Sequence, residues 1–324
     1  MTKIQILTPF FNEEEQIPIT IERMIPIMEA IGDDVSLLMV DDGSKDATWD
    51  KICEGAAKYP TRVKGVRFSR NFGKEAALLA GMDASDCDAL VIMDGDLQHP
   101  PEKIAEMVDL WKQGYEVVEG VKSERQKESF GSKMNAIFFY GFFKKISGYD
   151  LNNASDFKLL DRRVIDTLCS MPEHNTFFRG MAAWVGFKRT TFTFEVQDRE
   201  TGHSRWNFGK LIKLSVDAIT SFSSVPLQLI TMIGSLFMIG AFILAIQTLV
   251  RFFMGNAADG FTTVILVTLL IGACIMVSLG LIGTYIAKIF DEVKRRPRYI
   301  VSEDTNRNTK DKMNKQKESE EKNS

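Results

Sequence analysis

Residues 89–96 read Ala-Leu-Val-Ile-Met-Asp-Gly-Asp. Five apolar residues in succession are typical of a strand that is buried on both faces of a sheet. The predicted strand ends in two carboxylates, Asp94 and Asp96, which therefore lie at one edge of that sheet. Carboxylates at this spacing suit one divalent cation, Mg²⁺ or Mn²⁺, or one cation and one sugar hydroxyl, and such a cation is commonly shared with substrate phosphates. Many loops contain an Asp-x-Asp; the position after a buried strand is what favours a phosphate site here.

Strands and helices alternate around this stretch. We expect strands at residues 4–8, 35–40, 63–68 and 89–93, and helices at 13–31, 46–59, 73–84 and 100–112. Alternation at this spacing predicts an α/β domain with a mostly parallel sheet covered by helices on both faces. In such sheets the ligand lies at the carboxyl ends of the strands, where the polar clusters of this sequence also fall.

Three further polar clusters follow predicted strands. They are Pro9-Phe-Phe-Asn-Glu-Glu14, Asp41-Asp-Gly-Ser44 and Arg70-Asn-Phe-Gly-Lys74. Each has two explanations, because residues such as Asn12, Glu14 and an Asp-Gly pair also start helices and form turns. The functional alternative is that they bind the base, ribose or phosphates of a nucleotide. Asp156 is an isolated carboxylate for which structural capping competes with function in the same way.

Two long uncharged segments predict membrane spans. Residues 218–250 and 260–287 contain no Asp, Glu, Lys or Arg, and each is longer than the roughly 20 residues that cross a bilayer as a helix. A buried helix of a soluble protein is the alternative, but two such segments joined by a short loop disfavour it. Lys and Arg gather on the outer flanks of the pair, which predicts that both termini are cytoplasmic. We therefore expect transmembrane helices at 225–253 and 261–287.

The remaining segments are assigned by composition. Residues 1–200 form the predicted cytoplasmic catalytic domain, and residues 201–224 an amphipathic interfacial segment. The aromatic run 138–143 suits either a core or a membrane surface. Residues 302–324 are rich in Lys, Glu and Asn and are expected to be disordered. No apolar signal segment occurs at the N-terminus, so the catalytic domain is expected to begin in the cytoplasm.

Composition also disfavours several functions. The four cysteines are scattered without a Cys-x-x-Cys, which disfavours zinc sites and disulfide frameworks. The net charge of −3 gives no indication of a nucleic-acid partner, and none is expected. A homo-oligomer is compatible with the sequence.

Together these motifs resemble glycosyltransferase family two, specifically the polyprenyl-phosphate glycosyltransferases. That group includes dolichol-phosphate mannose synthases and bactoprenol glucosyl- and N-acetylglucosaminyltransferases. The matching stretches are Pro9 to Glu14, Val40 to Ser44, Ser69 to Ala76, Met93 to Pro100, Asp156 to Arg162 and Gly202 to Trp206. The paired C-terminal spans match as well, and the resemblance covers residues 3–300.

The resemblance implies a GT-A fold, a Rossmann-like and mostly parallel α/β domain, followed by interfacial and two transmembrane helices. It implies inverting transfer of one sugar, with glucose or N-acetylglucosamine as the leading options, from a UDP-sugar to undecaprenyl phosphate. The location implied is the cytoplasmic face of a bacterial plasma membrane, where the product would serve the cell envelope.

The resemblance also implies roles for particular residues. The nucleotide-sugar would contact Pro9, Asn12, Glu14, Asp42, Lys74 and Asp94. The metal, Mg²⁺ or Mn²⁺, would bind Asp96 and Gln98, and the catalytic residues would be Asp94, Asp96 and Asp156. Either the acceptor phosphate or the diphosphate would contact Arg125, Lys133 and Arg205. Two residues depart from the usual pattern: Gly95 stands where Ala is common, and Ser155 replaces the Gly before the acceptor-site Asp.

Two other functions agree with part of the sequence. A processive polysaccharide synthase carries Gln-x-x-Arg-Trp, but Gly202 stands at the Gln position and two spans are too few for a translocation channel. A non-catalytic nucleotide-binding scaffold is disfavoured because the chain retains Asp94, Asp96, Gln98 and Asp156 together.

Overall fold

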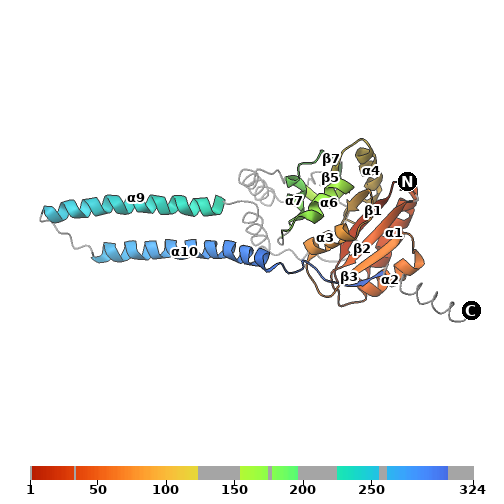
Figure 1. Cartoon of the computed structure of the whole chain (residues 1–324), viewed down its shortest axis with the longest axis horizontal. Helices are drawn as coiled ribbons and strands as arrows, with labels where there is room; N and C mark the ends of the chain where they lie inside the picture. The colour runs from red at the N-terminus through yellow and green to blue at the C-terminus, as the bar shows by residue number, and fades with distance from the viewer. Residues whose placement is uncertain are drawn as a thin grey trace, which may run out of the picture. The chain divides into compact units, whose positions relative to one another are not determined.

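The chain folds into two compact units. The computed structural model describes residues 2–32, 34–122, 154–173, 177–195, 225–254 and 261–305. One unit comprises Met1–Arg205 with Pro297–Ser324, and the other comprises Trp206–Arg296. The first contains the predicted α/β domain, and the second contains two long helices (Figure 1).

One mixed sheet forms the centre of the α/β unit. Its order within the described residues is β7-β5-β6-β4-β1-β2-β3-β8. The strands are β1 Ile4–Phe10, β2 Val35–Asp41, β3 Val63–Phe68, β4 Ala89–Ile92, β5 Val117–Lys122, β6 Ala154–Asp161, β7 Arg189–Phe194 and β8 Val301–Asp304. The four strands from β4 to β3 run parallel. Strand β6 is antiparallel to β4 and β5, and β8 is antiparallel to β3. The central strands β2 and β4 are buried along their whole length, as expected for parallel strands covered on both faces.

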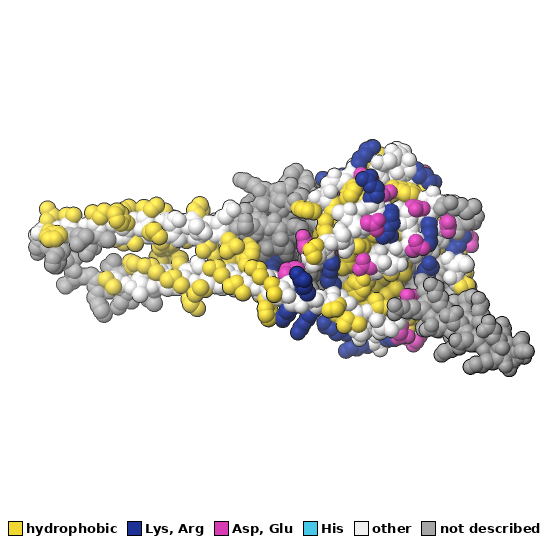
Figure 2. Space-filling view, in the orientation of Figure 1, with side chains coloured by type: hydrophobic (Ala, Val, Ile, Leu, Met, Phe, Trp, Pro, Cys, Tyr) yellow, Lys and Arg dark blue, Asp and Glu magenta, His cyan; other side chains and the backbone are white. Residues whose placement is uncertain are grey.

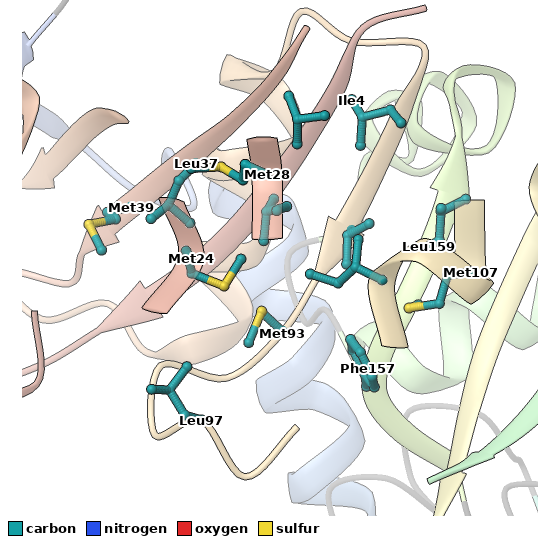
Figure 3. Close-up of a cluster of buried hydrophobic side chains, with 14 of the residues drawn as sticks. Ile4, Met24, Met28, Leu37, Met39, Met93, Leu97, Met107, Phe157 and Leu159 are labelled. Carbon is teal, nitrogen blue, oxygen red and sulfur yellow. The ribbon is translucent and has the colours of Figure 1, made fainter. Parts of the chain in front are cut away.

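Helices cover both faces of this sheet. They are α1 Gln16–Ile31, α2 Thr48–Lys58, α3 Lys74–Ala84, a 3₁₀ turn Pro101–Lys103 leading into α4 Ile104–Lys112, α6 Arg162–Ser170 and α7 Phe178–Trp184. Side chains of α1, α2 and α4 join one hydrophobic core with strand residues such as Ile6. Figure 3 shows part of this core, with Met24 of α1 and Met107 of α4 near Leu37 and Leu159 of the sheet. Helix α3 packs on the opposite face, where Leu7 points. A Cβ at Gly81 would lie 2.1 Å from Leu7 Cδ1, so this glycine allows α3 to approach β1 closely.

The predicted strands and helices of the first 112 residues are confirmed, with ends shifted by a few residues. The GT-A-like α/β architecture with a mostly parallel sheet is therefore correct. The antiparallel strand β6 was not expected, and neither were β5 beside it and β7 at the sheet edge, because residues 115–200 show no clear alternation in the sequence.

The second unit contains helices α9 Val225–Phe253 and α10 Phe261–Lys294. Among the described residues, one stretch, Leu270–Lys294, is long and apolar enough to cross a membrane, and Ile230–Leu244 is a shorter apolar helix. Two membrane spans therefore stay a prediction. Large apolar side chains on both helices face outward, including Met238 at 74%, Phe242 at 69% and Val277 at 71% exposed (Figure 2). The predicted interfacial segment 201–224 and the aromatic run 138–143 lie outside the described residues.

After α10 the chain returns to the α/β unit and adds β8 to the edge of its sheet. Ile300 accepts a hydrogen bond from Ser69 N at 3.0 Å. Tyr299 stacks on the buried Phe68 with ring centroids 5.3 Å apart, and its hydroxyl donates to Asp83 at 2.6 Å. Glu303 accepts from Trp49 Nε1 at 3.0 Å and from Arg67 at 2.9 Å. We call residues 298–305 the return segment.

The return segment corrects the prediction that a disordered tail begins at Ser302, because residues 301–304 are a strand. An edge strand can form its backbone hydrogen bonds without burying its side chains, so this short and mostly polar strand has no strand-like pattern in the sequence. Residues 306–324 of the predicted tail lie outside the described part of the chain.

Replacing Tyr299 with Ala should lower the stability of the α/β unit by about 1–3 kcal/mol, since the ring stack and the bond to Asp83 are both lost. Tyr299→Phe keeps the stack and should cost less than Ala. Thermal unfolding of the purified full-length protein measures both. Equal unfolding temperatures for wild type and Tyr299→Ala would show that the return segment does not stabilise the sheet.

Candidate active site

The carboxyl ends of the parallel strands meet in a cleft of about 370 Å³, a volume typical of small-molecule sites. It is lined by Pro9, Phe10, Phe11, Glu13, Asp42, Asn71, Gly73, Lys74, Ala77, Asp94, Gly95 and Asp96. The lining comes from the ends of β1, β2 and β4 and from the start of α3. The prediction that polar clusters converge at this edge is therefore confirmed for Pro9, Asp42, Lys74, Asp94 and Asp96.

Apolar side chains anchor the turn after β4 in the hydrophobic core. Met93 is completely buried and Leu97 is 1% exposed, and both belong to the core that Figure 3 shows. Gly95 lies against the ring of Phe10: a Cβ there would be 2.3 Å from Phe10 Cε1. Ala at position 95 would force this ring or the turn to move, which explains why Gly replaces the more common Ala.

His99 also holds this turn, through a hydrogen bond and a ring contact. Its Nδ1 accepts a hydrogen bond from Asp94 N at 3.1 Å, and its ring stacks on Phe157 at 5.0 Å. The side chain is 4% exposed. Burial lowers the pKa of His99, although Asp94 acts in the opposite direction, so the ring is neutral at neutral pH and remains an acceptor. The sequence placed His99 in a motif without giving it this role.

Asp42 clamps the loop between β3 and α3. One carboxylate oxygen accepts from Phe72 N at 2.7 Å and the other from Gly73 N at 2.9 Å. Burial raises the pKa of Asp42, and these two bonds partly offset the rise. Gly43 lets the turn press against this loop, because a Cβ there would lie 2.3 Å from the Arg70 carbonyl carbon and φ is +68°. The carboxylate that sequence analysis assigned to the nucleotide thus also fixes a wall of the cleft.

Asn12 and Glu14 act behind the cleft. Asn12 Oδ1 accepts from Lys45 N at 2.9 Å, and Glu14 Oε2 accepts from Ala47 N at 2.8 Å. Neither residue lines the cleft, although their neighbours Phe11 and Glu13 do. The structure therefore gives these two predicted nucleotide contacts a supporting position, in which they hold the turn that follows β2.

Lys74 joins the cleft to Asp156. Its Nζ lies 2.5 Å from Asp94 Oδ1 and 2.6 Å from Asp156 Oδ2. Burial alone would lower the pKa of Lys74, but the two carboxylates outweigh it and raise the pKa. A single charged amine thus bridges the turn after β4 and strand β6. Lys74 was predicted to contact the nucleotide-sugar, and this bridge to Asp156 was not foreseen.

Asp156 is held on its other side by Arg179 of α7. Arg179 Nε donates to Asp156 Oδ1 at 2.6 Å and Nη2 to Oδ2 at 2.9 Å. Burial raises the pKa of Asp156, but the bonds from Arg179 and the charge of Lys74 outweigh it and hold the pKa well below its usual range. Asp156 is thus a carboxylate with both oxygens engaged, which makes it a weak proton acceptor.

Neighbouring bonds fix β6 around Asp156. Ser155 is 2% exposed, and its hydroxyl donates to Gly120 O at 2.6 Å and accepts from Phe157 N at 3.2 Å. Ser in place of the usual Gly therefore adds a tie between β6 and β5. Lys158, two residues along the strand, pairs with Glu119 of β5. Burial lowers the pKa of Lys158, and Glu119 opposes that change.

Several predicted residues remain untested by geometry. Arg125, Lys133 and Arg205, the predicted acceptor contacts, lie outside the described residues. Gln98 follows the turn, and its N–H donates to Asp96 Oδ1 at 3.2 Å, which places the two predicted metal ligands side by side. Arg179 was missed, because nothing local in the sequence distinguishes it from a surface arginine; its proximity to Asp156 arises only from the packing of α7.

The fold and the cleft are those of a GT-A-like α/β domain with a small-molecule site at the carboxyl ends of its parallel strands. The chain belongs to Glycosyl transferase family 2, which matches residues 5–179. It is 39% identical to the glycosyltransferase YkcC of Bacillus subtilis over 91% of this chain and 92% of that protein. It is 36% identical to the prophage bactoprenol glucosyl transferase homolog of Escherichia coli K12, over 92% and 98% of the two chains. The bactoprenol glucosyl transferase of Shigella phage SfII is also 36% identical, over 92% and 97%. The predicted resemblance to polyprenyl-phosphate glycosyltransferases agrees with these relatives.

Lys74→Met should reduce glycosyl transfer by at least about 100-fold, because the carboxylates of Asp94 and Asp156 lose the cation that sets their positions. Lys74→Arg keeps the charge and should retain more activity than Met. Lys112→Met, which removes an exposed lysine at the end of α4, is the matched control. Transfer by Lys74→Met at the wild-type rate would mean that the bridge has no part in the reaction.

Proposed function

We propose that the protein transfers one sugar from a UDP-sugar to a polyprenyl phosphate at the cytoplasmic face of the membrane. The observation that carries the proposal is the Lys74 bridge, which links the Asp94 end of the cleft to the buried Asp156. A two-substrate transferase needs such an arrangement, because donor and acceptor must meet in line at one carbon atom. The relatives named bactoprenol glucosyl transferases support the choice of acceptor and make glucose the first sugar to test, with N-acetylglucosamine the second.

The donor fits the cleft. Pro9, Asp42 and Asp94 line it beside the exposed ring of Phe11, and a nucleotide has a base, a ribose and phosphates to contact them. Asp42 meets the base or ribose, and Asp94 meets the ribose or sugar. Asn12 and Glu14 contribute through the turn at Lys45 and Ala47 that they hold.

A divalent cation, Mg²⁺ or Mn²⁺, fits the oxygen donors at the cleft. Asp96 offers a carboxylate and Gln98 an amide oxygen, both ligands that hard cations prefer. The described residues contain no cluster of three or more His, Cys, Asp or Glu for a metal. Two or three protein oxygens suit an ion that takes its other ligands from a diphosphate and water. Bound there, the ion would offset the charge that grows on the departing diphosphate.

In the proposed reaction an oxygen of the acceptor phosphate attacks the anomeric carbon. The new carbon–oxygen bond forms as the bond to the diphosphate breaks, UDP leaves, and the configuration inverts. The acceptor phosphate is already anionic at neutral pH, so no strong base is required. Asp156, with both oxygens bonded to cations, orients Lys74 and Arg179 toward the reacting phosphates and does not take up a proton.

The second unit supports a membrane location. Helices α9 and α10 expose apolar side chains along their length (Figure 2), as helices in contact with lipid do. We propose that both helices span the bilayer, with the α/β unit and both termini in the cytoplasm. The acceptor's long apolar tail would then remain in the bilayer while its phosphate enters the site.

Purified protein, a panel of labelled UDP-sugars and undecaprenyl phosphate test the proposal directly. We expect one labelled lipid carrying a single sugar and requiring a divalent cation. A labelled polymer would favour a processive synthase, and nucleotide binding without any product would favour a non-catalytic scaffold.

Asp96→Asn should reduce transfer by at least about 100-fold and weaken metal-dependent UDP binding, since a neutral amide is a poor ligand for a hard cation. Asp109→Asn, at an exposed position on α4, should behave as wild type. Calorimetric UDP titrations with and without EDTA measure the binding. Full activity of Asp96→Asn, or of wild type in excess EDTA, would refute the metal assignment.

A cysteine placed at Asn256, between α9 and α10, should react with a membrane-impermeant thiol reagent in intact cells, since the positive-inside rule places this loop outside. A cysteine at the exposed Ser302 of β8 should react only after lysis. Wild type, with its four native cysteines, gives the background. Labelling of the Asn256 variant only after lysis would contradict the hairpin topology.

A further inference from the structure

Glu75 is a titratable side chain at the site that the proposed reaction does not use. It follows Lys74 in the first turn of α3, but it faces a small apolar pocket and not the cleft. That pocket is lined by Glu75, Leu79, Met82, Leu168, Phe178 and Met181. A carboxylate in apolar surroundings is costly unless it is hydrogen-bonded. Glu75 Oε2 accepts from Phe178 N at 2.7 Å.

This bond lies at the start of α7, one residue before Arg179. Phe178 is 3% exposed, so its ring is fixed in the core while its N–H is fixed by Glu75. Arg179 follows and donates two hydrogen bonds to Asp156. Helix α7 has only seven residues, Phe178–Trp184, and a helix that short has little stability of its own. Its placement therefore depends on contacts such as this one.

We propose that Glu75 is a positioning residue of the transfer reaction: by accepting the N–H of Phe178 it fixes the start of α7 and so holds the Arg179 guanidinium against Asp156. Two adjacent residues of α3 then serve the same carboxylate. Lys74 reaches Asp156 directly from the cleft side, and Glu75 reaches it through Phe178 and Arg179. The inference rests on the proposed function, because a role for Glu75 in transfer requires that Arg179 act where the acceptor phosphate enters.

The charge of Glu75 gives the proposal a pH signature. Burial raises the pKa of Glu75 to about 7; Asp156 of β6 adds to the rise, while the Phe178 N–H, Lys74 of α3 and Arg179 of α7 oppose it. Helix α6 contributes the apolar Leu168 to this pocket. Glu75 is therefore ionised above about pH 7 and loses its charge as the pH falls through that value. Its hold on the Phe178 N–H and its attraction for Arg179 weaken over the same range.

The same raised pKa fixes the sign of the effect on stability. The folded protein keeps a proton on Glu75 between the ordinary pKa of 4.5 and about 7, whereas the unfolded chain releases it. The contribution of Glu75 to stability therefore falls as the pH rises through this window. Glu75→Gln removes that loss, so the variant should be at least as stable as wild type above about pH 7. A loss of activity in a variant of undiminished stability is the mark of a functional residue.

Steady-state kinetics of the full chain, from about pH 6 to about pH 8.5, test the proposal. Above pH 7, Glu75→Gln should lower kcat/KM for polyprenyl phosphate by about tenfold to 100-fold, with KM for the UDP-sugar nearly unchanged. Wild-type kcat/KM for the acceptor should fall toward the Gln value as the pH drops through about 7. Glu106→Gln, which removes a surface carboxylate of α4 that pairs with Lys103, is the control.

A second variant tests whether Glu75 acts through Arg179. In an Arg179→Ala background, Glu75→Gln should cause little further loss, since residues that act through one another are not additive. Three results would overturn the proposal. The first is that the losses of kcat/KM from Glu75→Gln and Arg179→Ala add in the double variant. The second is that Glu75→Gln has the acceptor kinetics and pH profile of wild type, and the third is that it unfolds at a lower temperature than wild type at about pH 8. Absence of transfer by wild type with every donor would instead refute the proposed function.

Discussion

The site depends on one ammonium group held between two carboxylates. Lys74 Nζ lies within 2.6 Å of both Asp94 and Asp156, which come from the end of β4 and from the antiparallel strand β6. Without a cation between them, two carboxylates in a partly buried site would repel each other. The bridge therefore fixes the spacing of the two ends of the site, and with Arg179 it keeps the pKa of Asp156 low.

The rest of the α/β unit holds that amine in place. Lys74 begins α3, and the loop before it is clamped by Asp42 through the N–H groups of Phe72 and Gly73. Phe72 meets Phe68 edge to face at 5.7 Å, and Phe68 is stacked on Tyr299 of the return segment. A continuous series of contacts thus connects the return segment at the edge of the sheet with Lys74 at the centre of the site. Partly buried ion pairs contribute little net stability, so this arrangement is better explained by the reaction than by folding.

The sequence predicted those strands, helices and turns whose formation depends mainly on residues close together in the chain. Periodicity and turn chemistry predicted the buried run 89–93 and its two terminal carboxylates. They also predicted the polar clusters that contain Pro9, Asp42 and Lys74, and the structure brings these residues to one cleft. The contact between Lys74 and Asp156 spans 82 residues and has no local signature. Arg179 and Glu75 were missed for the same reason. Strand β8 was missed because it is short and three of its four residues are polar. The need for Gly95 appears only once Phe10 is packed against it.

A double-mutant cycle of Lys74→Met and Asp156→Asn, with kcat/KM for transfer as the readout, tests the central role of the bridge most directly. If one interaction links the two residues, the double variant should be little worse than the poorer single variant, with a coupling free energy above about 1 kcal/mol. Losses that add to within about 0.3–0.5 kcal/mol would show that the two residues act independently. That result would contradict the account of the site given by its geometry.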